Sequence, residues 1–201
     1  MLENNDKQKI EKYIEKIVSN VQKDVQKYIN SRLSDKQVVE KVVNVTVNKI
    51  TPESKMILSS VYNMLMGKTL QEPLFLESTN KAAFYERDIL KEIQNKFDFE
   101  VPSEINYEES KKTVNKLIAS GAVIVVGGVI SIAMDSWIPV GIAVILAGIM
   151  VALISRNKKT VALDSIISEY FDNVKASLLS WIETIVLYYD ERVEELKGKL
   201  V

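Results

Sequence analysis

The sequence contains no cysteine and no histidine among its 201 residues. Without cysteine, disulfides, thiol chemistry and thiolate metal sites are excluded. Without histidine, the most common general base near neutral pH is missing, and any metal site is restricted to oxygen ligands. No Ser, Lys or Tyr lies in a recognisable nucleophile motif. We therefore predict no catalytic residue, no metal site and no cofactor, and expect a protein that is not an enzyme.

The sequence also lacks an excess of either charge, because 26 Lys and Arg residues balance 27 Asp and Glu residues to a net charge of −1. No general positive field attracts nucleic acid, and no basic patch alternates with aromatic residues. Nucleic acid and small-molecule substrates are therefore not expected as partners. The polar, acidic segment 1–6 lacks the features of a secretory signal, so we expect the chain to begin in the cytoplasm.

The first expected helix covers residues 5–33, where apolar side chains recur at spacings of three and four and so share one face. Lys, Glu, Gln and Asp fill the opposite face. The stripe is similar to a coiled-coil seam, but it is short and fits a helix of an ordinary bundle better. Its apolar positions are Ile10, Ile14, Ile17, Val21, Val25 and Tyr28.

A second helix is expected to begin near Ser34, which has the spacing of a capping box with Gln37. The following residues 38–50 are ambiguous, since 43–48 alternate between apolar and polar side chains as a strand would. No partner strand is evident elsewhere in the sequence. We therefore predict a helix over 38–50.

The Thr-Pro-Glu segment at 51–53 predicts the start of a separate helix, because a capping residue precedes proline at the first helical position. Gly67 is expected to end that helix. Residues 67–69, Gly-Lys-Thr, imitate the end of a phosphate-binding loop. However, Tyr62 stands where the earlier glycine is required, and a helix precedes the segment instead of a strand. Nucleotide binding is therefore not expected.

Residues 79–97 predict a further amphipathic helix. A proline-containing connector at 98–116, acidic at first and then basic, marks the main internal boundary. The N-terminal region 1–97 is thus expected to be a helical unit on the cytoplasmic side. An apolar segment follows at 117–155, and 156–201 is expected to form an amphipathic helix that packs with the N-terminal helices.

The central segment dominates the functional interpretation. No charged residue occurs at 117–134 or at 140–155, and only a short break around Asp135 separates the two runs. A bilayer core about 30 Å thick needs about twenty apolar residues in a helix, and both runs approach that length without a polar face. We therefore predict an all-α protein in which an amphipathic helical bundle flanks a central hydrophobic hairpin of two transmembrane helices.

The residues around this hairpin predict its orientation. Cations precede the first run and follow the second, so the positive-inside rule places both termini in the cytoplasm. This makes the protein a multi-pass component of the inner (cell) membrane. The hairpin tip comprises Asp135, Trp137 and Pro139. The flanking cations are Lys111, Lys112, Lys116, Arg156, Lys158 and Lys159.

Small residues recur within both runs at spacings that suit close packing of membrane helices. In lipid, such residues let two backbones approach and gain van der Waals contact. We expect them to pack the hairpin, or several hairpins, together. The residues are Gly121, Gly127, Gly128, Ser131, Gly141, Ala143, Ala147, Gly148 and Ala152.

A wholly apolar helix pair can also be hidden inside a protein until that protein meets a membrane. In this plan the chain is similar to the pore-forming domains of colicins and the translocation domain of diphtheria toxin, and broadly to two-span effectors of bacterial defence systems. The resemblance is one of architecture, because no sequence motif accompanies it. It implies an α-helical pore-forming or membrane-disrupting effector as the alternative function.

The C-terminal residues 160–200 keep the three-four spacing of a long helix. The weakly charged stretch 176–189 is expected to lie buried against the N-terminal helices or, alternatively, at a membrane surface through its aromatic residues. The main functional prediction is a non-enzymatic integral membrane protein. Its hairpin contacts the lipid bilayer, and its amphipathic helices bind a second copy or a protein partner.

Overall fold

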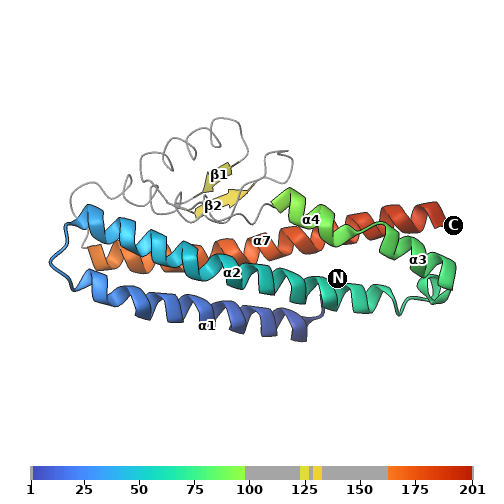
Figure 1. Ribbon diagram of the computed structural model, residues 1–201, viewed down its shortest axis with the longest axis horizontal. Helices are drawn as coiled ribbons and strands as arrows, with labels where there is room; N and C mark the ends of the chain where they lie inside the picture. The colour runs from blue at the N-terminus through green and yellow to red at the C-terminus, as the bar shows by residue number, and fades with distance from the viewer. Residues whose placement is uncertain (1, 98–122, 127–128, 133–162, 201) are drawn as a thin grey trace.

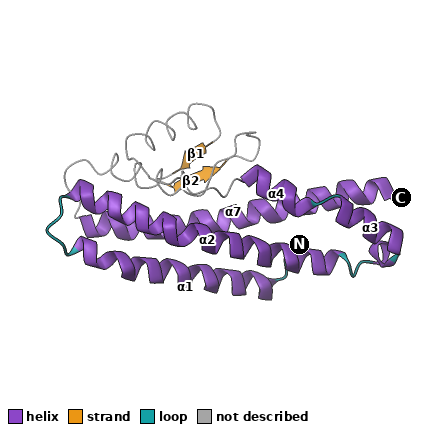
Figure 2. Cartoon of the chain, in the orientation of Figure 1, coloured by secondary structure: helices purple, strands orange, loops and turns teal. Residues whose placement is uncertain are grey.

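A computed structural model of the chain describes residues 2–97, 123–126, 129–132 and 163–200 (Figure 1). Apart from two strands of four residues each and short connections, these residues are helical, so the all-α prediction is confirmed for this part of the chain (Figure 2). The long helices are α1 (Asn4–Ile29), α2 (Asp35–Thr69) and α7 (Leu163–Leu200). The short elements are η1 (Pro73–Leu76), α3 (Ser78–Glu86), α4 (Ile89–Phe97), β1 (Val123–Val126) and β2 (Val129–Ile132).

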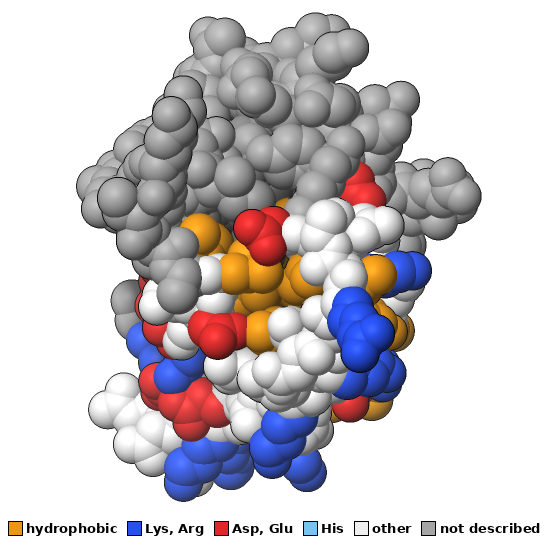
Figure 3. Space-filling model, turned by 90° about the vertical axis from the view of Figure 1, so that its left-hand side faces the viewer, with side chains coloured by type: hydrophobic (Ala, Val, Ile, Leu, Met, Phe, Trp, Pro, Cys, Tyr) orange, Lys and Arg blue, Asp and Glu red, His pale blue; other side chains and the backbone are white. Residues whose placement is uncertain are grey.

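The three long helices lie side by side as an elongated bundle (Figure 1). α2 returns antiparallel to α1 after a short connection, and α7 runs parallel to α2 and antiparallel to α1. The shorter helix α4 also packs on α7. An end-on view shows hydrophobic side chains gathered at the centre of the bundle end, with charged side chains around them (Figure 3).

The core follows the apolar stripes of the sequence. On α1 the buried residues recur at spacings of three and four, with Val18 beside Ile17, and they belong to the core that α1 shares with α2 and α7. Removing such a stripe from water is the main favourable contribution to folding. The buried residues of α1 are Ile10, Ile14, Ile17, Val18, Val21 and Val25.

Helix α2 begins where the capping signal predicts. The backbone amide of Ser34 donates a hydrogen bond to Gln37 Oε1 at 3.0 Å, which satisfies one of the unpaired donors at the helix start. The ambiguous residues 38–50 are helical, as predicted. Their alternating valines give no strand, because Val38, Val39, Val42, Val43 and Val47 are all buried against the other long helices.

The predicted helix start at 51–53 is wrong, because α2 continues through Pro52 without a break. The predicted end at Gly67 is also wrong, since the helix extends to Thr69. Tertiary packing overrides the local signal here: Thr51 and Ser54 are buried on the core side, while Pro52 lies on the exposed side of the helix. Thr51 therefore does not act as a cap.

The helix predicted over 79–97 is divided into α3 and α4 at Asp88. Asp88 has a φ of 46°, the left-handed region that a short polar side chain tolerates better than most. Its carboxylate accepts a hydrogen bond from the Lys91 amide at 3.3 Å, at the start of α4. The resulting bend turns α4 so that it packs along α7.

The prediction of two transmembrane helices is not supported. Among residues 2–97, 123–126, 129–132 and 163–200, no helix combines the length and the apolar character that crossing a bilayer requires. Within the first predicted span, β1 and β2 pair as antiparallel strands with Val123 opposite Ile132 and Val126 opposite Val129. β-Branched side chains favour this extended backbone, and two glycines between such runs are a hairpin signal. The predicted integral membrane function, inner-membrane location and membrane anchoring are corrected accordingly.

Most residues of the predicted hairpin lie outside the described part of the chain. This holds for the packing residues Gly121, Gly127, Gly128, Gly141, Ala143, Ala147, Gly148 and Ala152. It also holds for the tip, Asp135, Trp137 and Pro139, and for the flank, Lys111, Lys112, Lys116, Arg156, Lys158 and Lys159. Ser131 lies in β2, opposite Ile124, and β2 contacts α7.

Candidate functional site

A groove runs between the N-terminal half of α1 and the C-terminal half of α7. It encloses about 440 Å³. Because the two helices are antiparallel, residues near the start of α1 lie beside residues near position 190 of α7 (Figure 1). The apolar residues that line it are Leu2, Ile10, Leu179, Ile182, Val186 and Leu187.

The apolar lining follows from the spacing of residues on α7. Leu179, Ile182, Val186 and Leu187 are separated by three, four or one position, so they form a single stripe along the helix. Ile182 and Val186 are buried at the floor of the groove. Leu187, in contrast, is 57% exposed and stands on the rim. Leu187 therefore extends the apolar floor to the surface of the molecule, where another apolar group can contact it.

The charged residues of the groove are mainly acidic. Glu11, Glu183 and Asp190 supply three carboxylates, whereas Lys7 supplies one ammonium group. Glu11 and Glu183 are exposed on opposite walls, one from each helix. An apolar floor between acidic walls favours a ligand that combines apolar side chains with positive charge.

Ion pairs hold the two walls of the groove in place. Lys175 on α7 pairs with Glu15 on α1 beyond the Leu179 end. The hydrogen bond to Glu15 raises the pKa of Lys175, although burial acts in the opposite direction. At the other end, Lys68 of α2 lies 3.2 Å from Glu3 and 3.1 Å from Asp6. Lys175 thus joins the two walls near one end, whereas Lys68 attaches the α1 wall to α2 near the other.

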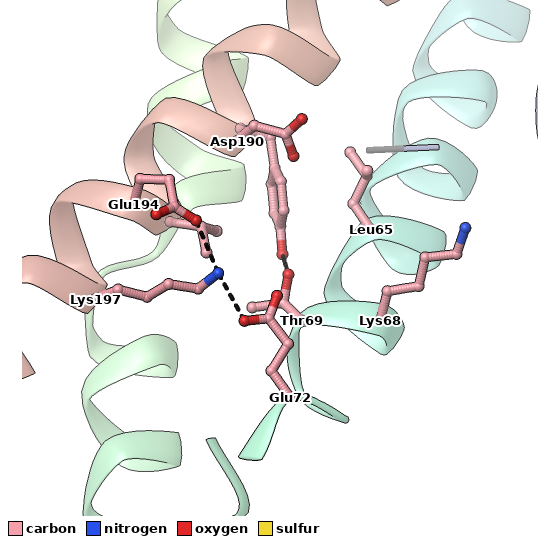
Figure 4. Close-up of a pocket in the computed structure, with 9 residues that line it drawn as sticks. Leu65, Lys68, Thr69, Glu72, Asp190, Glu194 and Lys197 are labelled. Carbon is pink, nitrogen blue, oxygen red and sulfur yellow. Dashed lines mark hydrogen bonds and ion pairs between the residues drawn. The ribbon is translucent and has the colours of Figure 1, made fainter. Parts of the chain in front are cut away.

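A second, smaller cavity of about 270 Å³ lies beside this latter end, between α2 and α7 (Figure 4). The Tyr189 hydroxyl donates a hydrogen bond to Thr69 Oγ1 at 2.9 Å, and burial raises the pKa of that tyrosine. Lys197 reaches between Glu72 and Glu194, at 2.6 and 2.8 Å. Burial opposes the charged form of Lys197, but these two contacts outweigh it and raise the lysine pKa.

The charged contacts of this cavity join the elements that surround it. Lys197 links α7 to the segment after α2, and the Tyr189–Thr69 hydrogen bond links α7 to the end of α2. Lys68 extends away from Lys197, towards α1 (Figure 4). The Gly-Lys-Thr segment at 67–69 thus lies at the end of α2, where Lys68 and Thr69 contact the neighbouring helices. We infer that the contacts around this cavity stabilise the fold.

The remaining described surface offers no metal centre. In the parts of the chain that the structure describes, no three acidic side chains gather closely enough to hold an ion. The fold defines the chain as an all-α bundle of three long helices with short additional elements. No protein-family model matches the chain, and no curated protein or solved structure matches it either.

The sequence interpretation predicted a long helix over 160–200 but missed the groove. Its signal was present: α7 carries apolar residues at 179 and 186–187 beside its main stripe at 178, 182, 185 and 189. When an apolar stripe is too wide for one neighbouring helix to cover, the helix has either a second neighbour or an open apolar surface. The spacing alone does not distinguish these two arrangements.

Proposed function

We propose that this protein is a non-enzymatic binding module whose α1–α7 groove accepts an amphipathic, basic helix from a protein partner. The observation that carries the proposal is the exposed Leu187 above the buried floor of Ile182 and Val186, flanked by acidic walls. Burial of a partner's apolar side chains on this floor supplies affinity. The carboxylates of Glu11 and Glu183 favour Lys or Arg beside those side chains.

The dimensions favour a helical ligand. The lining residues of α7 extend from Leu179 to Asp190, a helix length of about 16 Å at about 1.5 Å per residue. This matches about three helical turns of a ligand. A helix that lies in such a groove presents apolar residues at positions i, i+3 or i+4, and i+7.

A second copy of this chain is a less suitable occupant. A two-fold symmetric pair places the same surface on both sides of the interface. The three carboxylates of one groove would then face the same three carboxylates of the other, with a single lysine on each side. Like charges brought together oppose association, so a partner of opposite charge is favoured.

The proposal is tested with two labelled peptides of about 18 residues that share the same leucine positions, spaced for one helix face. One peptide carries lysine at the flanking positions and the other carries glutamate. Binding is followed by fluorescence anisotropy. The lysine peptide should bind at least about tenfold more tightly, and added salt should weaken it. The net charge of −1 makes general attraction to the protein small.

Leu187→Lys is the decisive variant because it removes apolar area and adds charge of the same sign as the ligand. We expect it to weaken binding of the lysine peptide by about tenfold or more. Met56→Lys is the matched control, since Met56 is 59% exposed on α2 and lines neither the groove nor the smaller cavity. Equal binding of the two peptides, or equal loss in both variants, would contradict the proposal. So would a dimer that Leu187→Lys dissociates, since a second copy would then occupy the groove.

A further inference from the structure

The segment before α1 forms the wall at one end of the groove. Leu2 precedes the first residue of the helix, yet it is only 7% exposed and belongs to the buried core cluster. It lines the groove together with Val186 and Leu187 of α7. An apolar side chain of the chain itself thus lies where an apolar side chain of a ligand would bind.

The same segment is attached to the bundle by charge. Glu3 and Asp6 both pair with the single ammonium group of Lys68 at the end of α2. Asp6 also lies 3.5 Å from Lys9, one turn further along α1. Lys68 is the one residue in these pairs that comes from another part of the chain, and its contacts bridge α2 to the segment that carries Leu2.

We propose that the segment Leu2–Asp6, which includes the first turn of α1, closes one end of the α1–α7 groove, is held there by Lys68 and is displaced when a basic helical ligand binds. This inference rests on the proposed function of the groove and assigns its regulation. Loss of Lys68 leaves two carboxylates close together without the cation between them, so the bound position of the segment becomes less favourable. We call these contacts the Lys68 latch.

The composition of the latch suits reversible release. An ion pair with a solvent-exposed partner is weak, and the Glu3 side chain is 74% exposed, although the Lys68 ammonium nitrogen is itself buried. The segment also mimics the proposed ligand in one respect, since Leu2 supplies an apolar side chain to the floor. A ligand that brings its own leucine can replace Leu2 on the floor, and its lysines can pair with Glu11 and Glu183 as the segment withdraws. Displacement then exchanges one set of contacts for a similar set.

The absence of cysteine from the chain allows a direct measurement. Leu2→Cys introduces a single thiol whose rate of reaction with a maleimide reports its exposure. The rate is measured in three forms of the chain: with Lys68, with Lys68→Gln, and with Lys49→Gln. Lys49 forms a comparable ion pair with Asp24 between α1 and α2, away from the groove. It therefore provides the matched control.

We expect Lys68→Gln to accelerate the reaction about fivefold, and Lys49→Gln to leave the rate unchanged. Electrostatics alone acts in the opposite direction, because removal of a nearby cation raises a thiol pKa and slows its reaction. Lys68→Glu should accelerate the reaction further, and a second change, Asp6→Lys, should reverse that effect. An unchanged rate in Lys68→Gln would overturn the proposal.

Two further measurements separate release of the segment from other causes. Val25→Cys places the thiol at a fully buried position of α1, and it should stay unreactive in every background. Acceleration at both positions would mean general loosening and would overturn the latch. Saturating lysine peptide should also accelerate the reaction of Leu2→Cys. If the peptide binds without accelerating the reaction, displacement of the segment is refuted but the proposed function of the groove is not. If Lys68→Gln accelerates the reaction and no peptide binds, only the proposed function is refuted.

Discussion

Helices α1 and α7 have the same three-four spacing of apolar residues but different positions in the bundle. α1 lies at the edge, packs against α2 and α7, and buries one narrow stripe. α7 contacts α1, α2, α4 and β2, and its buried residues are distributed around much of its circumference. The difference shows that periodicity identifies a helix, whereas the width of the apolar stripe reflects how many neighbours the helix has.

The contacts around α7 illustrate this width. On one side Tyr189 packs edge-on against Tyr62 of α2, with ring centroids 5.7 Å apart. On another side, Lys96 of α4 lies over the ring of Tyr188 at 4.3 Å. These neighbours cover adjacent positions of α7. Leu187, which precedes Tyr188, is not covered by a neighbouring helix, and this open position borders the candidate groove.

The largest predicted effect compares the covered and open faces of α7. Ile185 is fully buried, so Ile185→Ala should lower the free energy of unfolding by about 2–5 kcal/mol through lost contacts and a cavity. Leu187→Ala, two residues later, should change it by less than about 0.5 kcal/mol. Urea denaturation followed by far-UV circular dichroism measures both values. A comparable loss in the two variants would mean that Leu187 is covered in the folded protein and that the groove is closed.

The next effect concerns α2, which packs against both α1 and α7 but contains a proline inside the helix. Proline inside a helix costs about 3 kcal/mol relative to alanine, and Pro52 is exposed, so its replacement leaves no core cavity. Pro52→Ala should therefore raise the free energy of unfolding by about 1–3 kcal/mol. Pro73→Ala is the control, because proline suits the first residues of η1. If Pro52→Ala destabilises the protein, α2 is not continuous at this position.

Much of the helical part of the fold is predictable from sequence. The stripe from Ile10 to Val25 and the capping residues Ser34 and Gln37 specify α1 and the start of α2 through local contacts. The signal at Thr51 and Pro52 was misleading, because a helix start and a continuous helix with an exposed proline share the same local sequence. Burial of Thr51 in the bundle distinguishes them, and burial depends on distant residues.

The central segment shows a different limit of the sequence interpretation. Length and lack of charge suggested membrane helices, but they do not specify backbone conformation. The β-branched residues of 123–126 and 129–132, with glycine at 127 and 128, carried a competing hairpin signal. The groove was not predictable either, because its existence depends on which face of α7 the edge helix α1 leaves open.

The smallest predicted effect is the response of the edge helix α1 to acid. The hydrogen bond from Lys68 is the main reason that the pKa of Asp6 lies below its usual value of 3.8; burial acts against it, and Lys9 contributes in the same direction as Lys68. Glu3 shares the Lys68 ammonium, whose own pKa is raised, so Lys68 stays charged in acid. A depressed carboxyl pKa stabilises the folded state above about pH 3.8, and this contribution is lost as the pH falls through the lower, folded-state value.

Asp6→Asn removes this carboxylate, so the variant should lose less stability than the natural chain when the pH is lowered from 5 to 3. The midpoint of urea denaturation at several pH values in this range measures the difference. Asp24→Asn, which alters an exposed ion pair elsewhere on α1, is the control and should keep the full pH response. Parallel curves for the natural chain and Asp6→Asn would mean that Asp6 is not bound to Lys68 in solution. The N-terminal end of the edge helix would then be free to fray, while α7 remains held by its neighbours.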